Sequence, residues 1–209
     1  AMRSSANGRT MMIGVDRLDY SKGLHERFLG YDRYLAAHPE SHGQVFLLQI
    51  APPSREDVQS YREIRAALEG LSGRINGEYA NAQWVPIRYV NRGYPRDELA
   101  GMYRAARVGL VTPLRDGMNL VAKEYVAAQD PEDPGVLILS QFAGAAEQMP
   151  EALLVNPLSA EELSDAIEAA LSMPLQERIA RWQPMMDRIV REDVIWWRRR
   201  FTKALEALS

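Results

Sequence analysis

Two loops in this sequence carry residue types and spacing suited to binding a diphosphate. The first lies in residues 110–129, where a short apolar run ends in Thr-Pro, a polar loop carries Asp116, and a helical pattern starts at Leu120. A strand, a tight loop and a helix start in this order aim backbone N–H groups and the positive end of a helix dipole at an anion. Glu124 follows one turn into the helix. An anion cradle beside two carboxylates predicts a nucleotide sugar as the ligand, because its diphosphate is flanked by two polyols.

The second loop lies in residues 14–23, between the first predicted strand and the first predicted helix. Arg17 can hold two phosphate oxygens with its planar guanidinium, and Lys22 adds a point charge where the helix starts. The same residues have structural alternatives. Arg17 can instead pair with Asp16 or Asp19, and the Lys22 ammonium can simply be solvated.

The carboxylates of the first loop also have structural alternatives. Asp116 can instead be an ordinary helix-capping or loop residue, and Glu124 can instead lie on the solvated face of the helix. Two anion-suited loops at the ends of neighbouring strands nevertheless favour one shared site.

Three further loops follow predicted strands and have two interpretations each. Arg55 can bind a phosphate or form a surface ion pair. Tyr94 can form the wall of a pocket for a flat base or pack against the domain. The small residues within 140–147 permit the close approach of a ligand or another domain, or they form a tight turn.

Composition indicates a soluble globular domain with a substantial core, since the chain has 209 residues, of which 46% are hydrophobic and 25% charged. The net charge of -3 gives no argument for a nucleic-acid partner or an acidic membrane surface. No apolar run approaches the ~20 residues that cross a bilayer. The absence of cysteine excludes disulfides and thiol catalysis and fits a reducing cytoplasm, where we expect the protein to be located.

Motifs for several other chemistries are absent from the sequence. There is no Asp-x-Asp and no paired histidine, so we expect no metal site and no cofactor. There is no Gly-x-x-x-x-Gly-Lys-Ser/Thr phosphate loop and no Gly-x-Ser-x-Gly nucleophile turn.

Hydrophobic patterning predicts alternating strands and helices. Continuous apolar strands separated by helices are typical of an α/β fold, here a Rossmann-like parallel sheet with helices on both faces, whose ligands bind beyond the carboxyl ends of the strands. We expect a tag-derived or disordered segment over residues 1–9 and one nucleotide-sugar-binding domain over 10–209. Strands are expected at 10–15, 45–50, 84–90, 108–112, 136–140 and 153–156. Helices are expected at 24–37, 57–71 and 97–106. Another is expected to start at 120, and one to run from a capping box at 159 to residue 173. A further helix is expected to start at 174, and the last to cover 192–208.

Five longer segments carry a family resemblance. They are VDRLDYSKGL (15–24), QIAPPSREDVQ (49–59), GRING (73–77), GLVTPLRDGMNLVAKEYVAAQ (109–129) and LSQFAGAA (139–146). Through them the chain resembles, over nearly all of residues 10–208, the C-terminal half of the trehalose-6-phosphate synthases, retaining glycosyltransferases of family 20 with the GT-B fold. In that family the active site lies between two Rossmann-like domains. The N-terminal domain holds glucose 6-phosphate, and the C-terminal domain holds the nucleotide-glucose donor.

The resemblance implies a role for each site residue. Arg17, Lys22 and Asp116 are implied to be catalytic, since charge on the leaving diphosphate is stabilised by basic side chains and a helix end without a metal. Arg55 is implied to reach the acceptor phosphate. The implied donor contacts are Arg17 and Lys22 on the diphosphate, Asp116, Gly117, Met118 and Asn119 around the glucose, Leu120 and Val121 on the phosphate side, Glu124 on the ribose, and Ile50, Gly93 and Tyr94 at the base.

The resemblance leaves some questions open. Gly93 replaces a bulkier residue of some relatives, so the donor is UDP-glucose or GDP-glucose. The alternatives for function are a related transferase with another acceptor, such as a pseudo-glycosyltransferase or a glucosylglycerol-phosphate synthase, and a non-catalytic binding or regulatory homologue. Because the family's N-terminal domain does not precede Met11, we expect this chain to bind donor but to transfer glucose poorly or not at all. We expect residues 195–208 to cross back to that domain.

Overall fold

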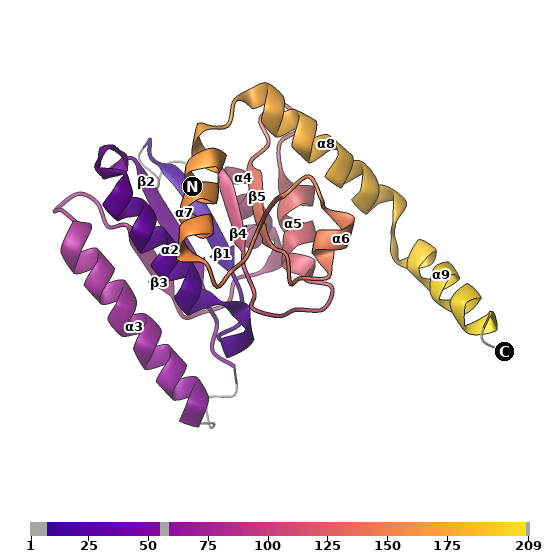
Figure 1. Cartoon of the computed structure of the whole chain (residues 1–209), viewed down its shortest axis with the longest axis horizontal. Helices are drawn as coiled ribbons and strands as arrows, with labels where there is room; N and C mark the ends of the chain where they lie inside the picture. The colour runs from indigo at the N-terminus through magenta and orange to yellow at the C-terminus, as the bar shows by residue number, and fades with distance from the viewer. Residues whose placement is uncertain (1–7, 55–58, 208–209) are drawn as a thin grey trace.

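The computed structural model of the chain describes residues 8–54 and 59–207. Its strands form one sheet in which every neighbouring pair is parallel, in the order β3-β2-β1-β4-β5-β6. Helices cover both faces of this sheet (Figure 1), so the predicted Rossmann-like α/β architecture is confirmed. The strands are β1 (Thr10–Val15), β2 (Val45–Ile50), β3 (Ile87–Val90), β4 (Val108–Val111), β5 (Val136–Ser140) and β6 (Leu153–Val155).

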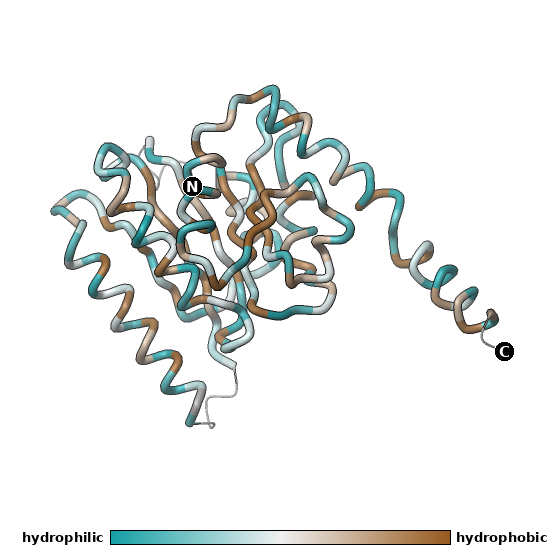
Figure 2. Tube along the Cα trace, in the orientation of Figure 1, coloured by the Kyte–Doolittle hydropathy of each residue, from teal (hydrophilic) through white to brown (hydrophobic). Residues whose placement is uncertain are grey.

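The helices divide between two hydrophobic clusters, one on each face of the sheet. They are α2 (Leu24–Ala37), α3 (Gln59–Tyr79), α4 (Arg96–Ala105), α5 (Leu120–Ala128), α6 (Ala145–Gln148), α7 (Ala160–Ser172), α8 (Leu175–Arg191) and α9 (Val194–Glu206), with 3-10 turns η1 (Tyr20–Lys22) and η2 (Pro39–Ser41). One cluster joins α2, α3 and α7 to strand residues such as Met12, and the other joins α4, α5 and α8 to residues such as Ile13. Successive strand residues face opposite clusters, which is why the strands are continuously apolar. Figure 2 shows this hydrophobic centre and the more hydrophilic outer helices.

The predicted bounds of most strands and helices agree with the observed ones. β1, β2, β5 and α2 occupy the predicted residues, and α5 starts at the predicted Leu120. β4 and β6 differ from the predicted strands by one residue at one end, and α4 and α7 differ from the predicted helices by one residue at each end. The short helix α6 has no counterpart in the prediction, because a single helical turn leaves no periodic pattern to detect.

Helix α3 is longer than predicted. The predicted helix covers 57–71, of which residues 57 and 58 lie outside the described residues, whereas the observed helix continues to Tyr79. Leu68 and Ile75 are fully buried in the same cluster, so the apolar face of the helix continues past residue 71. The segment GRING therefore lies within a helix.

Strand β3 begins at Ile87 rather than at the predicted Trp84. The backbone N–H of Trp84 donates to the carbonyl of Asn81 at 3.2 Å, which closes a turn. The buried indole Nε1–H donates to the carbonyl of Val45 at 2.7 Å. The apolar character of Trp84 thus reflects packing at the start of β2 rather than membership of β3.

The predicted capping box at the start of α7 is half confirmed. Ser159 Oγ accepts from the backbone N–H of Glu162 at 3.2 Å, as a helix cap should. The Glu162 carboxylate does not return the bond to Ser159. It accepts from the backbone N–H of Asn156 at 2.9 Å and so fastens the end of β6 to the helix.

The two C-terminal helices differ in how much they contribute to the core. Trp182 of α8 is buried, and its indole N–H donates to the carbonyl of Val126 in α5 at 2.9 Å. Helix α9 has no buried residue and extends away from the sheet (Figure 1). Its side chains Ile195, Trp197 and Phe201 are about half exposed. No helix within residues 8–54 and 59–207 has the length and apolar composition needed to cross a membrane.

Replacing Trp182 by Phe should lower the free energy of unfolding by about 1–3 kcal/mol, because the Val126 carbonyl loses its buried donor. Urea denaturation measures the change. Trp197→Phe is the matched control, since this exposed indole makes no hydrogen bond within the described part of the chain, and it should change stability by less than about 0.5 kcal/mol. Equal effects of the two substitutions would contradict the assigned anchoring of α8.

Candidate active site

The loops that follow β1 and β4 meet at the carboxyl edge of the sheet. The strand order reverses between these two strands, with α2 on one face and α5 on the other, which makes this edge the switch point where such sheets bind ligands. The N–H of Leu114 donates to the carbonyl of Ser21 at 2.8 Å. Lys22 Nζ lies 2.7 Å from Asp116 Oδ2, although the two residues are 94 positions apart. The structure therefore brings together the two loops singled out by spacing.

The carboxylate of Asp116 is held by three donors. Its Oδ2 accepts from Lys22 Nζ and from Asn119 Nδ2 at 2.8 Å, and its Oδ1 accepts from the Gly117 N–H at 2.9 Å. The side chains of Lys22 and Asp116 are 15% and 19% exposed, so the pair is shielded from solvent but open to a ligand. Lys22 is therefore not the freely solvated side chain of the alternative interpretation.

Arg17 does not form either of the ion pairs considered as alternatives. Asp16 bonds Arg27 instead, and Asp19 accepts from the N–H and Oγ of Ser21 and from the hydroxyl of Tyr61. These bonds outweigh desolvation and lower the pKa of Asp19. Arg17 is exposed, and its guanidinium has no hydrogen bond or ion pair with any residue in 8–54 or 59–207. Its charge is available to a ligand.

A buried arginine that the sequence pattern does not single out lies beneath the two loops. Arg27 of α2 is 1% exposed, and its guanidinium donates to Asp16 Oδ2 at 2.8 Å, Gln49 Oε1 at 2.8 Å and Thr112 Oγ1 at 2.9 Å. These partners follow or end β1, β2 and β4. Burial raises the pKa of Asp16, and the charge of Arg27 opposes that rise. In the sequence, the one indication that Arg27 is buried is its position on the apolar face of the predicted helix.

Glycines allow the backbone to close around this network. A Cβ on Gly14 would lie 2.4 Å from both Arg27 Nη1 and Gln49 Oε1. A Cβ on Gly23, whose φ is +63°, would lie 2.2 Å from the carbonyl oxygen of Thr112. Only glycine fits these positions, so the start of α2 lies directly against the end of β4.

The turn from Asp116 to Asn119 is held from both sides. Asn119 has a φ of 57° and caps α5, since its Oδ1 accepts from the Ala122 N–H at 3.1 Å. On the other side, the N–H of Gly144 donates to the carbonyl of Gly117 at 2.6 Å, and a Cβ on Gly144 would lie 2.4 Å from that oxygen. At the small residues within 140–147 the close approach is therefore made by the chain's own backbone, whereas the sequence suggested a ligand or another domain.

A pocket of about 480 Å³ lies between α4 and α5. Tyr103 and Leu99 line it from α4, and Leu120 and Glu124 from α5. Burial raises the pKa of Tyr103 well above its ordinary value, and among the described residues its hydroxyl has no hydrogen-bond partner. A mostly apolar pocket with a carboxylate at one side suits a nucleoside.

The residues expected at the base are not among those that line this pocket. Ile50 is 1% exposed, and its carbonyl accepts from the Asp16 N–H, so it supports the first loop from within the core. Gly93 is exposed with open space around it. The ring of Tyr94 packs beneath the guanidinium of Arg92, which lies 4.9 Å from the ring centroid. Their donor contacts remain predictions.

The remaining residues expected at the site differ in exposure, and one of them is not described. Val121 is half-buried on α5, and Met118 is 50% exposed at the turn. Arg55 lies outside the described residues. No group of three or more His, Asp or Glu residues suited to a metal ion occurs in residues 8–54 and 59–207.

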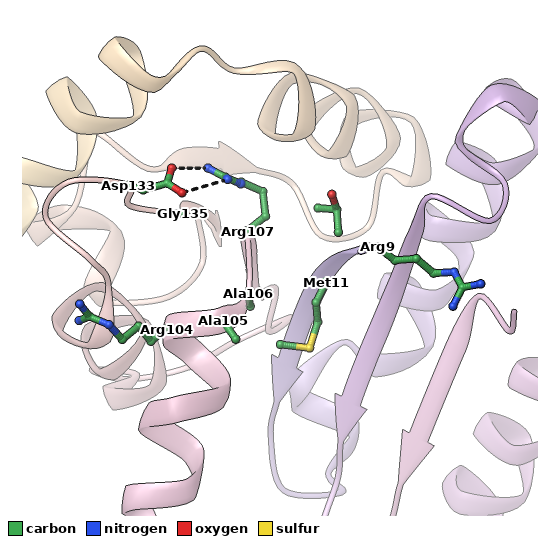
Figure 3. A pocket seen from close by; sticks show the side chains of 9 residues that line it. Arg9, Met11, Arg104, Ala105, Ala106, Arg107, Asp133 and Gly135 are labelled. Atoms are coloured by element: carbon green, nitrogen blue, oxygen red, sulfur yellow. Dashed lines mark hydrogen bonds and ion pairs between the residues drawn. The ribbon is translucent and has the colours of Figure 1, made fainter. Parts of the chain in front are cut away.

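A second pocket, of about 220 Å³, lies at the opposite, amino edge of the sheet. Arg9, Arg104 and Arg107 line it, but Figure 3 shows Arg9 and Arg104 directed away from its centre. The guanidinium of Arg107 is paired with Asp133 at 3.0 Å. These cations do not converge on a common point.

Fold and site together define a Rossmann-like domain of the GT-B class. Residues 1–207 match the family model described as Glycosyltransferase family 20, and the chain belongs to this family. The trehalose-6-phosphate synthase of Sinorhizobium fredii is 53% identical over 207 residues, which are 99% of this chain and 45% of that protein. The chain thus spans about half the length of this relative.

Two solved structures are close in fold and sequence. One is a UDP-forming α,α-trehalose-phosphate synthase from Burkholderia xenovorans in complex with glucose-6-phosphate, with a TM-score of 0.94, 51% identity and coverage of 97% of this chain and 44% of that one. The other is an E. coli protein bound with UDP-2-fluoro glucose, with a TM-score of 0.94, 51% identity and coverage of 98% and 45%.

Replacing Arg27 by Met should lower the free energy of unfolding by about 3–5 kcal/mol, because the buried carboxylate of Asp16 is left without its cation. The double variant D16N/R27M should recover part of this loss, since no buried charge remains. Urea denaturation gives both values. Arg33→Met, on an exposed face of the same helix, is the control and should be nearly neutral. A double variant no more stable than Arg27→Met alone would contradict the coupling of the two side chains.

Proposed function

We propose that this chain binds a nucleotide-glucose donor between the loops after β1 and β4. The observation that carries the proposal is the contact of Lys22 Nζ with Asp116 Oδ2 at 2.7 Å. It places a cation for phosphate and a carboxylate for sugar hydroxyls side by side at the switch point. A diphosphate linked to a hexose has these two groups adjacent.

The diphosphate receives positive charge from three sources in this proposal. Lys22 keeps N–H groups beyond the one bonded to Asp116, and Arg17 is exposed with an unpaired guanidinium in the described structure. The first turn of α5, at Leu120 and Val121, adds backbone N–H groups without intrahelical acceptors. Positive charge fixed in place before the reaction stabilises the leaving diphosphate as its C–O bond to glucose breaks. We propose that no metal ion takes part.

The nucleoside occupies the pocket between α4 and α5. Glu124 accepts hydrogen bonds from the ribose hydroxyls, and Leu99 and Leu120 offer apolar walls to the base. We propose UDP-glucose as the donor, because the E. coli relative is bound with UDP-2-fluoro glucose and the Burkholderia xenovorans relative is UDP-forming. GDP-glucose is the comparison ligand.

The reaction of the whole protein is proposed from the family. Glucose is transferred with retention to glucose 6-phosphate, the compound complexed by the Burkholderia xenovorans relative, and Arg55 contacts the acceptor phosphate. The 209 residues match less than half of that relative, so more than half of it has no counterpart in them. We therefore propose that the 209-residue chain binds donor but transfers glucose slowly. The exposed apolar side chains of α9 pack against the rest of the enzyme.

Calorimetric titration of the 209-residue chain with UDP, UDP-glucose, GDP and GDP-glucose tests donor binding. UDP and UDP-glucose should bind, and Arg17→Ala should weaken UDP by about tenfold, because one charge-assisted contact to phosphate is lost. Arg33→Ala is the control for loss of an exposed arginine and should leave the affinity unchanged. Absence of binding by all four ligands at millimolar concentration would refute the donor site.

A second assay tests the proposed low activity. UDP release from UDP-glucose in the presence of glucose 6-phosphate should be near background for the 209-residue chain. Rapid turnover by this chain alone would show that it also holds the acceptor.

A further inference from the structure

Asn119 has a backbone and side-chain geometry that helix capping alone does not require. Among residues 8–54 and 59–207 it is the one residue other than glycine with a positive φ, 57°. It is 8% exposed, and both ends of its amide are used. Oδ1 accepts from the Ala122 N–H at 3.1 Å, and Nδ2 donates to Asp116 Oδ2 at 2.8 Å. One partner is a donor and the other an acceptor, so only one orientation of the amide satisfies both.

Other residue types satisfy only part of this geometry. Serine, threonine and aspartate cap helices about as well as asparagine, and this chain caps α7 with Ser159 and α9 with Asp193. Glycine adopts positive φ but has no cap oxygen. Aspartate caps and tolerates the left-handed region, but it turns a second carboxylate toward Asp116. Asparagine combines the backbone conformation, the cap and a donor for the carboxylate.

The donor from Asn119 matters because Lys22, the other side-chain donor to Asp116, is also the cation proposed for the phosphate. A diphosphate bound to the other N–H groups of Lys22 competes for the charge that holds Asp116. The Asn119 amide then still holds Oδ2, and the Gly117 N–H still holds Oδ1. Asp116 therefore has two hydrogen bonds that do not depend on Lys22.

We propose that Asn119 is a positioning residue for hexose recognition, whose side chain fixes the Asp116 carboxylate from the buried side of the turn without itself contacting the donor. This inference rests on the proposed function, because it assigns Asp116 to the hexose hydroxyls. The role of Asn119 separates recognition of the diphosphate from recognition of the sugar. Lys22 is free to serve the diphosphate, while Asp116 stays oriented for the sugar.

The variant N119D tests the proposal, since it keeps the cap and replaces the donor by a carboxyl. At pH 8 the affinity for UDP-glucose should fall by about tenfold, and that for UDP by less, because UDP has no hexose. Below pH 6 the affinity for UDP-glucose should return toward the wild-type value. Two adjacent carboxylates share a proton, and the protonated carboxyl again donates to Asp116. The diphosphate of UDP-glucose is a diester and does not titrate in this range, unlike a terminal phosphate.

Controls separate this role from capping and from other titrations. Among the described residues, Lys22 and the buried Asp16 are charged groups that interact with Asp116, and N119D leaves both in place, so the ratio to wild type at each pH reports the introduced carboxyl. S159D adds a carboxylate at a distant cap and should leave affinity unchanged. N119A removes the cap and the donor, so it should lose affinity equally at all pH values and lower the melting temperature.

The outcomes distinguish failure of the positioning role from failure of the donor site. Wild-type affinity of N119D at pH 8 would overturn the positioning role, and so would a loss that is the same at pH 8 and pH 5. Failure of the wild-type chain itself to bind UDP-glucose would refute the donor site, and the inference with it.

Discussion

The buried guanidinium of Arg27 is the interaction on which the binding edge of this domain depends. An ionised side chain removed from water costs several kcal/mol unless its partners restore the lost hydration. Here Asp16 supplies the opposite charge, and Gln49 and Thr112 supply neutral acceptors. Such a network tolerates little displacement, because each partner that moves away leaves a buried polar group unsatisfied. The ends of β1, β2 and β4 are therefore fixed relative to one another.

This constraint determines where the site chemistry lies. Lys22 and Asp116 stand on loops that leave two of these strand ends, and the glycines at 14 and 23 let α2 approach the sheet closely enough to seat Arg27. The contact between the loops is thus a consequence of how the strands end rather than of the ion pair itself. A single ion pair would not hold two loops together unaided, because removing its charges from water costs much of what their attraction contributes.

Much of this arrangement follows from sequence patterns, and the exceptions have physical reasons. The strands and α2 were predictable because the sheet is buried on both faces, which leaves continuous apolar runs. The meeting of the two loops followed from the rule that parallel strands end at one edge. Arg27 was missed although it lies on the apolar face of its helix, because a charged residue in a helical pattern is usually solvated and its partners come from three separate strands. The pairing of Asp16 with Arg27, rather than with Arg17, was missed for the same reason.

The proposed donor site is supported by helices on opposite faces of the sheet. The loop that carries Lys22 leads into α2, which belongs to one hydrophobic cluster, whereas the pocket walls on α4 and α5 belong to the other. Substitutions that reshape the pocket therefore repack a core that the α2 side does not share. The shape of the proposed base pocket can thus change without disturbing the packing that places Lys22.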